Sequence, residues 1–557
     1  MPYRKHESDA AREHVDDGIV GELVQQFADP YAFYRELVQN AIDAGTSEVK
    51  VLVRPRASGG VRVSVRDDGE GMNPEVLENK LLVLFRSGKE GRTDAIGKFG
   101  VGFVSVLALH PEKVTVETSR GEGAVWTMHL FSDHRYDLFE VSRSAPPGTT
   151  VSLDLPALDA SEFIERSKAS LRAWCRHAAV PIWFQIAQGV LQKEAGEDAD
   201  GDVDLDQSRI DEPIGLPECL AQVDMTVGTT RIVLGVPKDP TGYAGFFNHG
   251  LTLFETSLQD PALIPTGALH FKVQDIRLEH TLSRDNVRRD AAFHDVLRKV
   301  RDVYEDHLVP AVLSTMRRAL EAGDDHRYAG LLARVLHPSA PLSIPVSRLP
   351  VRLLHWGSGV VARKELASGA VGSAYETALS HALAERGVQV VDAGPGRGLA
   401  RGPTQYLTEL DLEDARTTYT LVVPMPSPSA DAEALLDRLA ALFAASWRAP
   451  TGIQLVAFHG AHANRLLGGG KVDHAPWVTE GTLDANPFRM LRRPGLLLNV
   501  THSAVTGALA LAEDDPLLAA TMLARGIALD REDLDDGLDE AMTEWALTEA
   551  LTSRSPS

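Results

Sequence analysis

Residues 31–45 form the first clearly patterned segment of the chain, with apolar side chains at the spacing of a helix. The residues on its apolar face are Leu37, Val38, Ala41 and Ile42. Gly45 follows the last apolar turn and predicts the end of the helix. Residues 49–54 and 61–66 alternate apolar and polar side chains around a glycine-containing turn, so we expect a hairpin of two half-buried strands.

Helix and strand patterns continue to alternate and predict a modular α/β protein. A chain of 557 residues is too long for one core, because a domain averages about 150 residues. Strand patterns at residues 113–118 and 149–155 complete an α/β sandwich (an α+β fold), which we place at residues 1–192. Residues 193–208 are rich in acidic side chains and poor in core-forming ones, so they predict an acidic linker or loop.

The rest of the chain is predicted to hold three further parts. Residues 209–335 mix strands with a long helix over 293–320 and predict a second α/β unit. Residues 345–460 repeat this mixture, with an amphipathic helix over 430–447. Residues 461–557 have a mainly helical pattern.

Composition and charge narrow the function classes. An apolar fraction of 44% is ordinary for a soluble globular protein, and no run approaches the roughly 18 apolar residues of a membrane helix. The first residues lack the apolar stretch of a secretory signal, so we expect a cytoplasmic protein. A net charge of -22 would repel a nucleic-acid backbone over most of the surface, which disfavours nucleic acid as the main partner. We interpret Cys175 and Cys219 as small apolar side chains.

Glu36, Asn40 and Asp43 give the predicted first helix a polar stripe opposite its apolar face. Their spacing of i, i+4 and i+7 brings the three side chains to one side of the helix. Such a stripe is by itself most often a solvated surface. It gains weight because two motifs suited to a nucleotide follow it in the chain.

The first of these motifs is an acidic turn with glycine at the end of a strand, residues 67–72. Asp67 can direct a carboxylate at an exocyclic amine, and Gly71 lets a flat base approach the backbone. The second is the glycine-rich segment 97–102, whose amides lie where a helix begins and suit phosphate oxygens. Each motif alone is also typical of an ordinary turn.

Taken together, the segments ELVQNAIDA, DDGEGM and IGKFGVGF resemble the three ATP-binding signatures of the gyrase, heat-shock chaperone, histidine kinase and MutL superfamily. In detail the chain resembles the heat shock protein 90 family. RSGKEG before IGKFGVGF is similar to that family's lid and phosphate loop, and Gly148-Thr149-Thr150 resembles its last nucleotide motif. The resemblance covers about residues 20–190, weakens in the second unit and fades after about residue 330. It implies a Bergerat-type ATP-binding domain followed by a transducer-like middle domain.

The resemblance also implies a role for each site residue. Asp67 would hydrogen-bond the adenine amine, Asn40 would hold Mg²⁺, and Glu36 would orient or deprotonate the attacking water. Arg284, in a loop of the second unit, would neutralise charge at the γ-phosphate, the alternative being an ordinary surface arginine. The other nucleotide contacts would be Asp43, Gly71, Met72, Ser87, Gly88, Lys89, Gly97, Phe99, Gly100, Val101, Gly102, Phe103 and Thr149.

The function implied by the resemblance is that of an ATP-hydrolysing, chaperone-like machine that couples lid closure and domain docking to the remodelling of a protein client. Its cofactors would be ATP and Mg²⁺, and its partners a protein client and a second copy of the chain in a homodimer. Two alternatives stay open: a MutL-like ATPase switch in nucleic-acid processing, and a nucleotide sensor that does not hydrolyse ATP. A histidine kinase is disfavoured because no helix with a phosphoacceptor histidine precedes the site.

Overall fold

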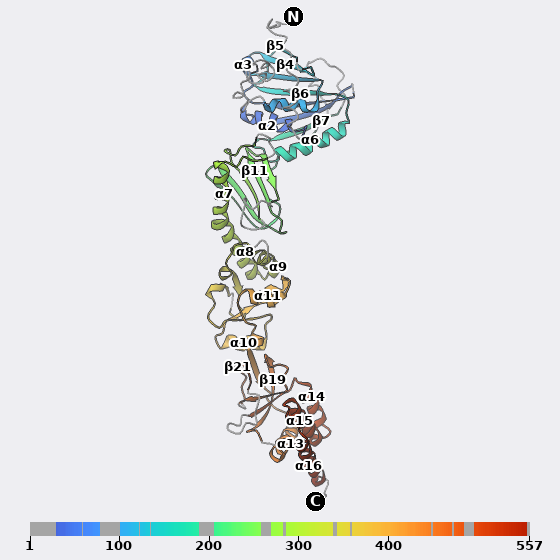
Figure 1. The fold of residues 1–557 in the computed structure, drawn as a ribbon, viewed down its shortest axis with the longest axis vertical. Helices are drawn as coiled ribbons and strands as arrows, with labels where there is room; N and C mark the ends of the chain where they lie inside the picture. Colours follow the sequence, from blue (N-terminus) through green and yellow to red (C-terminus); the bar gives the residue numbers. More distant parts are fainter. Residues whose placement is uncertain are drawn as a thin grey trace. The chain divides into compact units, whose positions relative to one another are not determined.

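The computed structural model describes most of the chain, and Figure 1 shows its helices and strands. The described residues are 29–57, 59–77, 101–121, 123–133, 135–188, 205–257, 269–281, 286–337, 342–356, 359–446, 449–470, 473–483 and 495–553. The chain divides into two compact units, Met1–Ala311 with Ser339–Pro341 and Val312–Pro338 with Leu342–Ser557. Among the helices of these described ranges, none is long and apolar enough to span a membrane.

An eight-stranded sheet forms the N-terminal domain, residues 29–209 of the first unit, with the strand order β5-β4-β3-β6-β2-β1-β7-β8. Figure 1 labels β4, β5, β6 and β7 of this sheet. The strands are β1 Val49–Pro55, β2 Val61–Asp67, β3 Lys113–Ser119, β4 Val125–Phe131, β5 Tyr136–Val141, β6 Gly148–Leu155, β7 Ile182–Ala187 and β8 Leu205–Arg209. The helices are α2 Phe33–Asp43, α3 Pro74–Val76, α5 Val101–Val104, the 3₁₀ turn η3 Ser105–Leu109 and α6 Ala160–Cys175. Neighbouring strands are antiparallel except for β1 and β7, which run parallel.

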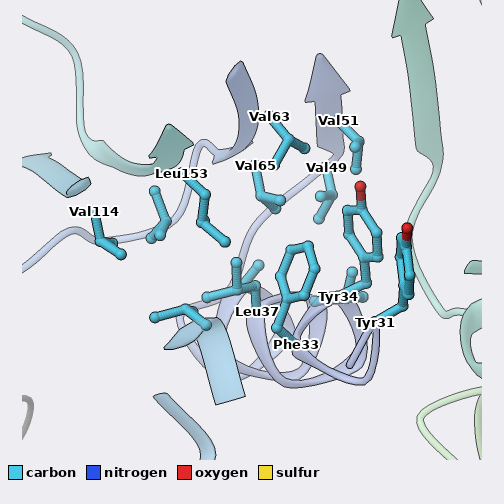
Figure 2. Packing of buried hydrophobic residues seen from close by; sticks show 14 of the residues in the cluster. Tyr31, Phe33, Tyr34, Leu37, Val49, Val51, Val63, Val65, Val114 and Leu153 are labelled. Atoms are coloured by element: carbon cyan, nitrogen blue, oxygen red, sulfur yellow. The ribbon is translucent and has the colours of Figure 1, made fainter. Parts of the chain in front are cut away.

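The core of this domain lies between the sheet and α2 (Figure 2). Alternate residues of β1 and β2 are buried, as the predicted hairpin requires. The contacting side chains labelled in Figure 2 include Phe33, Tyr34 and Leu37 on α2 and Val49, Val51, Val63 and Val65 on the strands. Burying one such side chain stabilises the fold by roughly 1.5 to 3 kcal/mol. The apolar face of α2 therefore fixes which of its residues point away from the core.

The structure differs from the predicted linker over residues 193–208 at the C-terminal end of that segment. Leu205–Arg209 is strand β8, which pairs antiparallel with β7 at the edge of the sheet. Its side chains are mostly exposed, so the strand is held by backbone hydrogen bonds and carries no apolar alternation. Residues 193–204 of the acidic segment lie outside the described residues.

The second domain, residues 219–311, is a five-stranded sheet followed by a long helical segment. Its strand order is β12-β11-β13-β10-β9. The strands are β9 Cys219–Val227, β10 Thr230–Pro237, β11 Tyr243–Asn248, β12 Leu251–Thr256 and β13 His270–Gln274. The helical segment consists of α7 Ala291–Val303, the π-helix η4 Tyr304–Leu308 and α8 Val309–Ala322, which enters the second unit. The predicted long helix over 293–320 is thus confirmed, with one π-helical turn inside it.

A buried carboxylate ties this sheet together. Asp275 follows β13 and has a fully buried side chain. It accepts hydrogen bonds from Thr230 Oγ1 at 2.5 Å and from Arg277 Nε and Nη2 at 3.0 and 2.8 Å. Burial by itself raises the pKa of the Asp275 carboxyl, but these hydrogen bonds outweigh it and lower the pKa to about 2.

The second unit contains a five-stranded sheet in the order β20-β22-β19-β18-β21 and two small two-stranded sheets, β14-β15 and β16-β17. The strands are β14 Pro350–Arg352, β15 Val360–Ala362, β16 Val371–Ser373, β17 Val390–Asp392, β18 Tyr419–Pro424, β19 Ile453–Gly460, β20 Leu467–Gly470, β21 Trp477–Glu480 and β22 Gly495–Asn499. The helices are α9 Asp325–Val335, η5 Val346–Arg348, η6 Arg363–Glu365, α10 Ala378–Glu385, η7 Gly394–Gly398, α11 Gly402–Glu409, α12 Ala415–Thr418, α13 Ala430–Ser446, α14 Ser503–Ala512, α15 Pro516–Asp530 and α16 Asp536–Ser553. The helices α13 to α16 share one apolar core, so the helix predicted over 430–447 packs with helices of the predicted region 461–557.

Candidate nucleotide-binding site

Helix α2 carries the predicted polar stripe on the side away from its buried face. Glu36 is half-buried, whereas Asn40 and Asp43 are exposed. Gln39 Nε2 donates a hydrogen bond to Asp43 Oδ1 at 2.9 Å, which holds the Asp43 carboxylate along the helix surface. Glu36 and Asn40 are one turn apart, so their side chains can act on the same ligand.

The end of β2 brings Asp67 into register with two threonines of neighbouring strands. Asp67 lies opposite Thr149 of β6, and Thr149 lies opposite Thr118 of β3. Asp67 Oδ1 accepts hydrogen bonds from the amides of Gly69 at 2.9 Å and Thr149 at 3.2 Å. The sheet and the turn together fix the orientation of the carboxylate.

Thr118 is a component of this site that sequence reasoning missed. Its hydroxyl oxygen accepts a hydrogen bond from the amide of Met72 at 2.8 Å and lies 3.0 Å from Oγ1 of Thr149. Only 1% of the residue is exposed, so Thr118 supports the turn from the interior through its hydrogen bond with the Met72 amide. No local sequence signal distinguishes Thr118 from other strand threonines, because its role depends on the register between β3 and β6.

The turn after Asp67 requires glycine at two points of close backbone approach. Gly71 has a φ of +66°, and a Cβ there would lie 1.9 Å from the carbonyl oxygen of Ser119. A Cβ on Gly148, at the start of β6, would lie 2.4 Å from the carbonyl oxygen of Asp67. These contacts press the turn against β3 and β6 with no room for a side chain.

Asp68 clamps the turn to the loop that follows α2. Its carboxylate accepts hydrogen bonds from the Ser47 hydroxyl, from Thr46 Oγ1 at 2.5 Å and from the Ser47 amide at 2.7 Å. These bonds, with the Ser47 hydroxyl contributing most, hold the pKa of the Asp68 carboxyl well below its usual range. The clamp fixes the end of β2 relative to α2, and hence Asp67 relative to Glu36 and Asn40.

The pKa of the Asp67 carboxyl is shifted in the opposite direction from that of Asp68. Burial raises the pKa of the Asp67 carboxyl, and the Gly69 and Thr149 amides only partly offset this. Among the described residues, none donates a hydrogen bond to Oδ2 of Asp67. A half-satisfied, partly desolvated carboxylate is a strong acceptor for an N–H donor of a bound ligand.

The glycine-rich segment is described from Val101 onward. Helix α5 is described over Val101–Val104, and the carbonyl oxygen of half-buried Gly102 accepts a hydrogen bond from Ser105 Oγ at 2.5 Å. The Phe103 side chain is 3% exposed and packs in the domain core, where it anchors α5. The other residues predicted for the lid, the phosphate loop and the second domain lie outside the described residues: Ser87, Gly88, Lys89, Gly97, Phe99, Gly100 and Arg284.

Arg35, next to Glu36, connects α2 to the second domain. It is 4% exposed, and its guanidinium lies 4.9 Å from the ring centroid of Trp174 on α6. Its Nη2 lies 2.5 Å from Nδ1 of His280, four positions before Arg284 in the chain. The segment of the second domain that leads to Arg284 therefore contacts the helix that carries Glu36.

Comparison with known proteins agrees with this geometry. Residues 34–141 match the model of the family described as histidine kinase-, DNA gyrase B-, and HSP90-like ATPases. Chaperone protein HtpG of Methylorubrum extorquens (strain PA1) is 30% identical over 219 residues, which are 33% of this chain and 34% of the relative. The HtpG proteins of Rickettsia bellii (strain OSU 85-389) and Treponema pallidum (strain Nichols) are 31% and 30% identical, over 27% and 32% of this chain and 29% and 33% of their own lengths.

The predicted resemblance is confirmed by these matches. The chain contains an ATPase domain similar to those of histidine kinases, gyrase and heat shock protein 90, and its N-terminal sheet with α2 and α6 fits the predicted Bergerat fold. The chain spans about a third of the length of the HtpG relatives that it matches.

Proposed function

We propose that this chain is an ATP-hydrolysing, chaperone-like protein in which nucleotide turnover drives the remodelling of a protein client. The observation that carries the proposal is the pairing of an oriented, partly desolvated acceptor, Asp67, with the Glu36 and Asn40 stripe on α2. The family match over residues 34–141 and the similarity to HtpG chaperones support it.

In the proposed complex, Asp67 binds the adenine. Its carboxylate accepts the exocyclic amine through Oδ2 while Oδ1 stays bonded to the Gly69 and Thr149 amides. The absence of a side chain at Gly71 lets the turn lie directly against β3, which holds Asp67 in position to bind the base. The Thr118 hydroxyl, bonded to the Met72 amide and to Thr149, keeps the turn in place.

Asn40 and Glu36 act at the phosphate end of the nucleotide. The Asn40 amide oxygen is a suitable ligand for Mg²⁺, a hard cation that prefers oxygen, and its side chain is exposed. Bound Mg²⁺ would supply charge neutralisation between the phosphates. Glu36 orients the attacking water and takes up its proton, since a carboxylate one turn away on the same face can reach a water in line with the γ-phosphate. The amides of Gly100, Val101 and Gly102 bind phosphate oxygens.

Arg284 is proposed to complete the site from the second domain. A guanidinium at the γ-phosphate stabilises the charge that develops during transfer. The contact between Arg35 and His280 supports this role, because it ties the segment before Arg284 to α2. ATP turnover then depends on the contact between the N-terminal and second domains. In the same proposal, the lid residues Ser87, Gly88 and Lys89 close over the bound nucleotide.

We further propose that the chain forms a homodimer through its last two helices. Leu518, Met522 and Leu529 on one face of α15, and Leu547 and Leu551 on α16, are 47% to 70% exposed. A two-fold dimer needs only one such self-complementary apolar patch. Sedimentation of the wild type and of Leu547→Lys tests this, and a wild-type monomer at all concentrations would overturn it.

Calorimetric titration with ATP tests the proposed site. Asp67→Asn removes a charge-assisted acceptor, which should cost about 1.5 to 3 kcal/mol of binding, or about 10- to 150-fold in Kd. The matched control is Asp137→Asn, the same substitution at an exposed position on β5 of the same sheet, which should bind ATP as the wild type does. Equal affinity of the wild type and both variants would place the nucleotide elsewhere.

A further inference from the structure

The joint between the N-terminal and second domains is tightly packed. Thr252 Oγ1 of β12 donates a hydrogen bond to the carbonyl oxygen of Ala173 on α6 at 2.8 Å, and the Ala179 amide donates to the carbonyl oxygen of His249 at 2.9 Å. Gly250 has a φ of +77°, and a Cβ there would lie 1.6 Å from the carbonyl oxygen of His177. Small displacements at this joint therefore break specific contacts.

His177 sits inside this joint in a single protonation state. It follows α6, is 5% exposed, and has partners on both ring nitrogens. Nε2 lies 2.8 Å from Nζ of Lys272 on β13, and Nδ1 lies 3.1 Å from the carbonyl oxygen of Glu212. A lysine ammonium can only donate a hydrogen bond, so Nε2 must accept one. Nδ1 must therefore carry the ring proton, and it donates a hydrogen bond to the carbonyl oxygen of Glu212. The ring is therefore neutral.

Among the described residues around His177, the carboxylates Glu212 and Glu255 both interact with Arg176. Arg176, on the N-terminal side, pairs with Glu255 of β12 at 2.7 Å and lies 3.8 Å from the Glu212 carboxylate. Glu255 also accepts the Tyr243 hydroxyl of β11 at 2.6 Å. A second cation, Lys272, is 6% exposed and faces His177 directly, with the Tyr243 ring centroid 5.9 Å from its ammonium.

We propose that this joint is an acid-sensitive coupling between the N-terminal and second domains, opened when a proton enters at Nε2 of His177. The proton removes the acceptor of the Lys272 hydrogen bond and sets an imidazolium against a buried ammonium. Opening separates the cations and lets water solvate both.

The direction of the pH dependence follows from the burial of His177. Burial lowers the pKa of the imidazole below its ordinary value. The hydrogen bond to the Glu212 carbonyl and the Glu212 charge oppose this shift, and the neighbouring cations Lys272 and Arg176 reinforce it. The open joint thus binds a proton more readily than the closed one. Above about pH 6.5 the pH no longer affects the closed joint, which has its full stability there. Below that pH, the equilibrium constant for opening the joint rises by up to about tenfold for each pH unit.

Amide hydrogen exchange of the full-length chain without nucleotide tests the proposal. The reporter is the Ala179 amide, whose bond to His249 crosses the joint. With intrinsic exchange rates divided out, its protection in the wild type should fall between pH 7.5 and pH 5.5, by up to about tenfold per pH unit below about 6.5. Because no ATP is present, the result does not depend on the proposed function.

Two variants test whether His177 causes the pH dependence of joint opening. His177→Gln keeps an oxygen acceptor for Lys272 and an N–H donor for Glu212 but cannot titrate, so its protection should be independent of pH. His294→Gln, at an exposed position on α7, should behave as the wild type. If His177→Gln opens the joint at every pH, Lys272→Met decides: it removes a cation that acts together with burial on His177, and it should reduce the pH dependence while His177 remains.

Three outcomes would overturn the proposal. Wild-type protection that is flat between pH 7.5 and 5.5 would do so, as would an unchanged pH dependence in both His177→Gln and Lys272→Met. The joint also holds other histidines, among them His280, which contacts Arg35. A pH dependence that disappears in His280→Gln but persists in His177→Gln would likewise refute the assignment to His177.

Discussion

Replacing Gly71 with alanine should disrupt the turn that orients Asp67. The φ of +66° is a left-handed conformation that costs an alanine about 1 to 2 kcal/mol. The added Cβ would lie 1.9 Å from the carbonyl oxygen of Ser119, and this obstacle is backbone that cannot rotate away. The turn must move off β3, which breaks the 2.8 Å hydrogen bond from the Met72 amide to Thr118.

The two effects together give the expected magnitude. A buried hydrogen bond left unmade costs about 1 to 3 kcal/mol, so Gly71→Ala should destabilise the N-terminal domain by about 2 to 5 kcal/mol. Gly45→Ala is the matched control, because Gly45 has a φ of +73° but a Cβ there meets no atom within 4 Å. That variant should lose only the conformational part, about 1 to 2 kcal/mol.

Native-state hydrogen exchange of peptides from β2 and β3 measures this difference locally, without requiring the whole chain to unfold in one step. Calorimetry should also find ATP binding weakened in Gly71→Ala and retained in Gly45→Ala. If both variants lose the same protection from hydrogen exchange and bind ATP equally well, the turn accepts a Cβ at Gly71 without cost. That result would refute its proposed role in orienting Asp67.

Three further predictions concern the described polar groups. Thr118→Val leaves the Met72 amide without its acceptor and should cost about 1 to 3 kcal/mol in thermal unfolding, with weaker ATP binding. Asp275 has a pKa of about 2 in the folded chain, so the stability that its carboxylate contributes should be complete above about pH 4 and lost as the pH falls through about 2. Asp275→Asn should therefore show a smaller change between about pH 4 and pH 2 in an acid titration followed by circular dichroism. Burial raises the pKa of the Cys175 thiol to about 12, so a maleimide at pH 7 should leave it unmodified in the folded chain and label no cysteine other than Cys219, as mass spectrometry would report.

The local pattern of apolar and polar residues predicted helices and strands well where only one face of the element is buried. The apolar face of α2 and the alternation in β1 and β2 follow directly from the sequence, because one face of each packs on the core. Strand β8 was not predictable in this way, since its mostly exposed side chains carry no alternation.

The candidate site was foreseeable only in part. Asp67 and Gly71 share one turn, so their spacing in the chain reveals them together. Thr118 depends on a strand register, and the contact between Arg35 and His280 joins positions 245 residues apart. Such contacts are decided by tertiary packing, which no local pattern encodes.

Steady-state ATP hydrolysis by the wild type, Glu36→Ala and Arg284→Ala, with ATP affinity measured in parallel, tests the central claim most directly. The account predicts that all three bind ATP and that the wild type alone turns it over, with Glu36→Ala losing on the order of a hundredfold or more as expected for a missing general base. A wild type that does not bind ATP, or a Glu36→Ala variant that hydrolyses it at the wild-type rate, would contradict it.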